Sequence, residues 1–180
     1  MALIPKIPSL WSVEFEIIAL GDVDTVPRWS SIIHVTNGEN NGAPGNRYPG
    51  VFISTETRQL LITSYVNGDH NYQYRTPNDT SRNEWTKIII EQIERDSKII
   101  YRIEINGETV QEVENTTPTE FHDMTFYAAD PWLAAANVNL RNLIYRRYPT
   151  GNLNRSVYFV GEIFFVVQKQ WAAPWGANIS

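Results

Sequence analysis

Apolar and polar residues alternate along residues 11–20. The apolar side chains occupy the odd positions from Val13 to Ala19, and Glu14 and Glu16 lie between them. Successive side chains of a β-strand point to opposite faces, whereas an α-helix repeats about every 3.6 residues. Residues 11–20 are therefore predicted to form a strand with one buried and one solvated face.

Similar apolar segments recur along the chain, separated by turn residues. The further predicted strands are residues 29–36, 51–54, 60–66, 85–93, 98–106, 108–114, 121–129, 139–146 and 157–168. Asn106 and Gly107 predict a hairpin between two of them, because both residues tolerate the positive φ of a type I′ turn. Only residues 132–136 favour a helical turn. The sequence thus predicts an all-β protein, an antiparallel jelly-roll sandwich of about ten or more strands with little or no helix.

A loop rich in turn residues interrupts this pattern at residues 37–46, which include four Asn, three Gly and one Pro. Long loops without structure of their own are often functional, so this loop is a candidate rim of a binding site. No linker composition divides the chain. We expect a single jelly-roll domain over residues 1–170, followed by a C-terminal tail at 171–180.

Composition supports the fold and excludes several kinds of chemistry. Ile, Val, Thr and the aromatic residues total 68, whereas Ala, Leu and Met total 22, which is the bias of a strand-forming chain. The absence of cysteine excludes disulfides, thiol nucleophiles and thiolate zinc sites. A net charge of −5 without a basic motif argues against nucleic acid as a partner.

The sequence gives mixed indications of cellular location. No signal peptide is visible, and the longest apolar run, 157–167, is shorter than the roughly 20 residues of a membrane helix. Four N-x-S/T sequons begin at Asn78, Asn115, Asn154 and Asn178. They favour an extracellular or secreted protein with no membrane span, and a cytoplasmic location stays open.

The order of motifs over residues 11–147, about three quarters of the chain, resembles the concanavalin A-like lectin and glucanase superfamily, and within it laminin-G-like jelly rolls. The motifs are the strand WSVEF from Trp11, the strand WTKIII from Trp85, the hairpin YRIEING ending at Gly107 and the closing strand LRNLI from Leu140. The resemblance implies a jelly roll. It does not fix one function, because this superfamily includes lectins, adhesion modules, glycanases and structural domains.

Catalytic constellations are weak in this sequence. Glycanases that resemble this fold carry acidic residues at alternate positions of one strand, and the nearest match is Glu94 with Asp96. The third acid of such a motif is absent, and a solvated corner at a strand end is the simpler interpretation. His34 lies inside an apolar strand and is expected to be a hydrogen-bonded core or rim residue. We therefore do not expect an enzyme.

Calcium is a candidate cofactor, since jelly rolls that resemble this one often bind one calcium ion at the rim. Calcium needs about six to eight oxygen ligands, supplied by carboxylates, amides and carbonyls of loops. The candidate ligands are Asp130 and Asn137, with Asp22, Asp24 and Asp69. The alternative for Asp130 is that it accepts backbone hydrogen bonds and caps the turn after it.

Sugar binding would need an aromatic face for stacking and polar side chains for the hydroxyl groups. The loops offer Arg47, Tyr48, Asn71, Tyr72 and Trp132 as candidate ligand contacts. The alternative is that the loop aromatics fix their loops onto the sandwich. The leading hypothesis is a non-enzymatic module that binds a glycan or glycoprotein through its rim. A structural or adhesion domain that forms a homo-oligomer is the alternative, and a glycan-active enzyme is the least favoured hypothesis.

Overall fold

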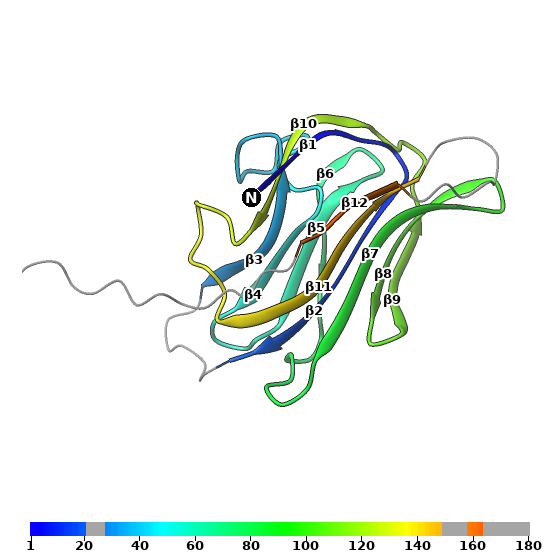
Figure 1. The fold of residues 1–180 in the computed structure, drawn as a ribbon. Helices are drawn as coiled ribbons and strands as arrows, with labels where there is room; N and C mark the ends of the chain where they lie inside the picture. The colour runs from blue at the N-terminus through cyan, green and yellow to red at the C-terminus, as the bar shows by residue number, and fades with distance from the viewer. Residues whose placement is uncertain (21–27, 149–157, 164–180) are drawn as a thin grey trace, which may run out of the picture.

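The computed structural model of the chain describes residues 1–20, 28–148 and 158–163, which form twelve β-strands and no helix (Figure 1). The strands are β1 (Ala2–Ile7), β2 (Trp11–Ala19), β3 (Trp29–Thr36), β4 (Gly50–Ser54), β5 (Leu60–Val66), β6 (Asp69–Arg75), β7 (Thr86–Arg95), β8 (Lys98–Ile105), β9 (Glu108–Glu114), β10 (Phe121–Ala128), β11 (Val138–Arg147) and β12 (Tyr158–Ile163).

The strands form two six-stranded antiparallel sheets. Sheet A has the order β1-β10-β3-β4-β5-β6, and sheet B has the order β12-β11-β2-β7-β8-β9. Figure 1 shows them as two layers, with β3, β4 and β5 in one and β11, β2 and β7 in the other. The predicted antiparallel jelly-roll sandwich is confirmed. The expected domain end at residue 170 and the tail 171–180 lie outside the described residues.

The core lies between the two sheets and follows the alternation of the sequence. On β2, Val13, Phe15 and Ile17 are fully buried, whereas Glu14 and Glu16 keep partial exposure. Inward side chains of β1, β3, β4, β5, β7, β8, β10 and β11 add to the cluster from both sheets. Removal of this apolar area from water is the main stabilising contribution of the fold.

Two strands and one loop differ from the sequence prediction. β6 was expected to be part of a loop. Its inward positions are occupied by His70, Tyr72 and Tyr74, and because these side chains carry polar atoms, the sequence shows no alternation of apolar and polar residues there. β1 contains Pro5, which is compatible with its place at the edge of sheet A, where Pro is tolerated. Residues 132–136 were expected to form a helical turn and instead form bends and an isolated bridge from Ala135 to Ser31.

Two loops cover the outer face of sheet A, meaning the face turned away from sheet B. The segment 37–47 follows β3 and returns beside it, where the Tyr48 N–H donates to the Val35 carbonyl at 2.9 Å. The segment 129–137 runs along the other side of β3, where the Ser31 N–H donates to the Ala134 carbonyl, also at 2.9 Å. β3 is consequently buried on both faces over most of its length.

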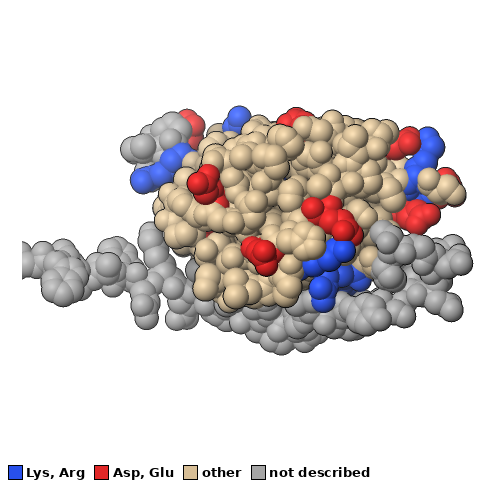
Figure 2. Space-filling model, turned by 90° about the horizontal axis from the view of Figure 1, so that it is seen from above, with Lys and Arg blue, Asp and Glu red and all other residues tan. Residues whose placement is uncertain are grey.

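Figure 2 shows that uncharged residues cover most of the face seen from above. On this face, small acidic patches stand alone or next to basic side chains. In the described residues, no helix is long and apolar enough to span a membrane.

We expect Phe15→Ala to lower the free energy of unfolding by about 3–5 kcal/mol, because it removes a fully buried ring from the contact between the sheets. Urea unfolding followed by fluorescence measures the change. Leu3→Ala is the control, since 74% of Leu3 is exposed, and it should change the stability by less than about 0.5 kcal/mol. Equal losses in the two variants would contradict this assignment of the core.

Candidate functional site

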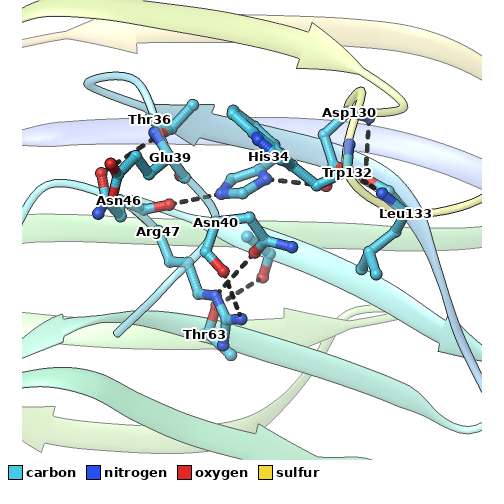
Figure 3. Close-up of polar contacts among 12 residues, drawn as sticks. His34, Thr36, Glu39, Asn40, Asn46, Arg47, Thr63, Asp130, Trp132 and Leu133 are labelled. Carbon is cyan, nitrogen blue, oxygen red and sulfur yellow. Dashed lines mark hydrogen bonds and ion pairs between the residues drawn. The ribbon is translucent and has the colours of Figure 1, made fainter. Parts of the chain in front are cut away.

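A buried histidine lies at the centre of the outer face of sheet A. His34 projects from β3 and is fully buried beneath the two covering loops. Its Nδ1 lies 2.8 Å from Oδ2 of Asp130 in one loop, and its Nε2 donates to the carbonyl of Asn46 in the other. Figure 3 shows the imidazole between these partners. His34 therefore joins both loops to the sheet, as a hydrogen-bonded residue rather than an open base.

The hydrogen-bond partners define the charge of this pair. The Asn46 carbonyl can only accept, and an ionised carboxylate can only accept, so both ring nitrogens of His34 donate when Asp130 is ionised. Burial alone would raise the pKa of Asp130, but the hydrogen bonds from His34 and from the Leu133 N–H outweigh it and place that pKa below its ordinary value. An ionised Asp130 therefore accepts a hydrogen bond that Nδ1 of His34 donates.

Asp130 also fixes the start of its own loop. Its Oδ1 accepts the N–H of Trp132 at 3.0 Å and the N–H of Leu133 at 2.8 Å. Both oxygens of the carboxylate are therefore engaged, and its side chain has no exposed surface. The hydrogen bonds hold the backbone of Trp132 in place.

Trp132 is the exposed aromatic residue of this site. It keeps 41% of its surface exposed, and its ring makes edge contacts with His34 at 5.6 Å and Tyr127 at 5.8 Å between centroids. One part of the indole thus packs on buried residues, and the rest faces solvent. An aromatic surface held in this way is suited to stacking on an apolar ligand face.

The loop 37–47 is held by its own polar groups. Thr36 Oγ1 accepts the N–H groups of Gly38 and Glu39 at 3.1 Å, and Asn46 Nδ2 donates to Asn41 Oδ1 at 2.6 Å. Gly45 has a φ of +81°, and a Cβ there would lie 2.8 Å from Asn37 Nδ2, so only glycine fits. The loop is a defined structure, consistent with its predicted place at a rim.

Arg47 ends this loop and lies against the sheet. Its Nε donates to Asn40 Oδ1 at 3.1 Å, and its Nη1 donates to Asn71 Oδ1 on β6 at 2.9 Å. The guanidinium also lies 5.5 Å from the ring centre of Phe52, the aromatic neighbour of His34. Arg47 therefore connects the loop, β4 and β6 on one surface.

Four of the predicted site residues are brought together by the fold. The contacts described above run from Asn71 to Arg47 and through Phe52 and His34 to Asp130 and Trp132. Phe52 was not predicted as a residue of this site. Its sequence position in a strand does not indicate whether its ring lies on the inner or the outer face of the sheet.

Tyr48 and Tyr72 were predicted as ligand contacts but face the interior. Tyr48 is fully buried against Trp11, with 5.0 Å between ring centroids, and its hydroxyl donates to the Thr119 carbonyl. Burial raises its pKa well above the ordinary value. Tyr72 packs on Tyr101 and hydrogen-bonds Gln111. For these two residues the competing interpretation applies, since their rings fix local structure to the sandwich.

The predicted calcium ligands do not form one site in the described residues. Asp69 Oδ1 accepts the Asn71 N–H at 2.9 Å, and Asn137 Nδ2 donates to the Leu20 carbonyl at 3.0 Å. The described residues contain no group of three or more His, Asp or Glu that could hold a metal ion. Asp130 does not fit a cation, because its oxygens already accept three donors. Asp22 and Asp24 lie outside the described residues.

Comparison with known proteins supports the fold. No protein-family model and no curated protein matches the sequence. Eighteen chains of solved structures match the fold, among them the native heptameric SAP-like pentraxin from Limulus polyphemus, with a TM-score of 0.50 and 12% identity. The match covers 81% of this chain and 66% of that one. Pentraxins have the concanavalin A-like fold, so the likeness shows that fold for this chain, and the laminin-G-like assignment stays a prediction.

We expect Asp130→Asn to lower the free energy of unfolding at neutral pH by about 3–5 kcal/mol, because it leaves His34 without its buried counter-ion. The folded pKa of Asp130 is depressed, so its contribution is complete above the ordinary value of 3.8 and is lost as the pH falls below it. Urea unfolding between pH 7 and pH 2.5 should show the two proteins converging at the acidic end.

Asp79→Asn is the matched control for this comparison. Asp79 is exposed in the loop after β6, and its replacement should alter stability by less than about 0.5 kcal/mol at every pH. A difference between wild type and Asp130→Asn that stays constant down to pH 2.5 would contradict the ionised pair.

Proposed function

We propose that this protein is a non-enzymatic module that binds carbohydrate on the outer face of sheet A. The observation that carries the proposal is the partly exposed indole of Trp132, which is held by the buried His34–Asp130 pair. His34 and Phe52 connect it to Arg47 and Asn71. The apolar face of a pyranose stacks on an indole, while guanidinium and amide N–H groups donate to its hydroxyl oxygens.

Preorganisation supports this assignment. The Trp132 backbone is fixed by the Asp130 carboxylate, and Arg47 is held by Asn40 and Asn71 before any ligand arrives. A rigid site loses little conformational entropy on binding, which improves affinity for a polar ligand that water solvates well.

The engagement of His34 and Asp130 inside the protein supports binding rather than catalysis at this face. Both ring nitrogens of His34 and both oxygens of Asp130 have partners inside the protein. Glu94 is exposed at the end of β7, and Asp96 is exposed in the turn that follows. These two acids lie at the exposed hairpin between β7 and β8.

Calcium dependence stays a prediction of this proposal. Its remaining candidate ligands are Asp69, which is exposed at the start of β6, Asn137, whose backbone pairs with Leu20, and the acids Asp22 and Asp24 that follow Leu20 in the chain. Asp130 is not included. Binding measured with calcium and with a chelator tests this part independently.

An extracellular location is also proposed, and the sequons give it a structural test. Asn78 is exposed in the loop after β6 and could carry a glycan. Asn115 is buried, and its Nδ2 donates to Gln92 Oε1 at 2.6 Å, so the folded protein has no room for a glycan there. The sequons at Asn154 and Asn178 lie outside the described residues.

We expect Trp132→Ala to weaken glycan binding at least tenfold, since it removes the stacking surface, an effect of about 1.4 kcal/mol or more. A glycan array identifies the ligand, and titration calorimetry measures its affinity with calcium and with chelator. The control is Trp85→Ala. Trp85 is partly exposed and is covered by Arg141 on the outer face of sheet B, so this variant should bind the glycan like wild type. No binding by the folded wild type in either condition would overturn the proposal.

A homo-oligomeric adhesion domain is the second candidate, favoured by the exposed edge strand β1. Leu3 keeps 74% exposure there, and the similar pentraxin is described as heptameric. Edge strands with exposed apolar residues readily pair with other chains. If this candidate holds, light scattering after gel filtration should give a multiple of 20.7 kDa for wild type and a smaller mass for Leu3→Lys. A monomeric wild type would reject it.

A further inference from the structure

A second arginine lies on an aromatic ring on the outer face of sheet A. The guanidinium of Arg75 at the end of β6 lies 5.3 Å from the ring centre of Trp29 at the start of β3. Arg47 and Phe52 form the other such pair, at 5.5 Å. Stacking occupies the face of a guanidinium and leaves its N–H edge for carboxylate or sulfate oxygens. In Arg47, three of the five N–H groups already donate to Asn40 and Asn71, so two N–H groups remain for a ligand.

Strand register places the two pairs on the same surface. Phe52 is opposite Leu61, Leu61 is opposite Arg75, and Trp29 is opposite Ser54, two positions along β4 from Phe52. Directly paired residues share a sheet face, as do residues two apart in a strand. Arg47 reaches the same strand as Arg75, since it donates to Asn71, four residues earlier on β6. This spacing along the strand is about 13 Å.

The arginines of the two sheets differ in their partners. On sheet B, Arg95, Arg102, Arg141 and Arg146 each form an ion pair with a glutamate, at distances of 2.5–2.8 Å. The fifth sheet B arginine, Arg147 at the end of β11, donates to the Lys6 carbonyl instead. On sheet A, neither Arg47 nor Arg75 forms an ion pair with a carboxylate of the described residues, although the chain has a net charge of −5. Arg75 is exposed and makes no hydrogen bond in the same part of the structure.

We infer that the ligand of this face is an acidic oligosaccharide, whose carboxylate or sulfate groups are bound by Arg75 and Arg47. The inference rests on the proposed function, because the sugar rings would stack on Trp132. Burial lowers the pKa of Arg47 from its ordinary value, because fewer water molecules stabilise its positive charge. An anion bound beside the guanidinium would stabilise that charge in their place. The spacing of the two arginines fits a ligand of several rings rather than a monosaccharide.

Titration calorimetry with three hexasaccharides tests the inference. The probes are a heparin hexasaccharide with sulfate and carboxylate groups, a hyaluronan hexasaccharide with carboxylate groups only, and a desulfated, N-acetylated, carboxyl-reduced heparin hexasaccharide without charge. We expect at least one acidic probe to bind at least tenfold more tightly than the neutral probe, and its affinity to fall as salt is raised. The probe that binds more tightly identifies the anionic group.

Two arginine variants test whether the acidic probe binds on the outer face of sheet A. Arg75→Gln should weaken binding of the acidic probe about tenfold. It should cost at most about 1 kcal/mol of stability, because the exposed Arg75 side chain contributes only its stacking on Trp29 in the described residues. Arg141→Gln is the matched control, an arginine stacked on Trp85 at 3.8 Å that already pairs with Glu16, and it should bind like wild type.

The outcomes separate the two proposals. Equal affinity for neutral and acidic probes, with loss of both in Trp132→Ala, would overturn the acidic ligand and keep the carbohydrate site. The inference would also be overturned if Arg141→Gln weakened binding of the acidic probe as much as Arg75→Gln does. That result would show that the probe is attracted by the positive charge of any arginine and not by this face. No binding of any probe or array glycan would overturn both.

Discussion

The outer face of sheet A depends on one buried ion pair, between His34 and Asp130. Isolated charges are unstable inside a protein, and here each charged group satisfies the other while backbone groups engage their remaining hydrogen-bonding atoms. The pair joins residues 96 positions apart in the chain. It therefore determines where two loops lie on the sheet and, through the backbone of Trp132, the position of the exposed indole.

The fold could be predicted because its signal is local. The alternation on β2 and the Asn-Gly turn before β9 each specify a strand or hairpin from a few neighbouring residues, and both occur in the structure. β6 escaped prediction because its core-facing residues are the half-buried Tyr72 and Tyr74, and tyrosine is equally typical of loops. An alternating pattern identifies a strand only when its inward residues are plainly apolar.

The site could be predicted only in part, because it depends on the direction of side chains and on distant partners. Arg47, Asn71 and Trp132 come together as polar and aromatic loop composition indicated. Tyr48 follows Arg47 directly yet points into the core, and no local pattern distinguishes the two directions. The burial of His34 was expected from its apolar strand, whereas its partner in a loop before β11 was not.

The two faces of β6 have different roles: the inward side chains pack on the core, and the outward side chains lie on the proposed binding surface. His70, Tyr72 and Tyr74 face the interior, while the outward positions 71, 73 and 75 contribute to the surface next to Arg47 and Trp29. Substitutions at the outward positions leave the inward packing in place. This strand is thus a place where the ligand preference of the protein can diverge, by evolution or by design, while the sandwich stays the same.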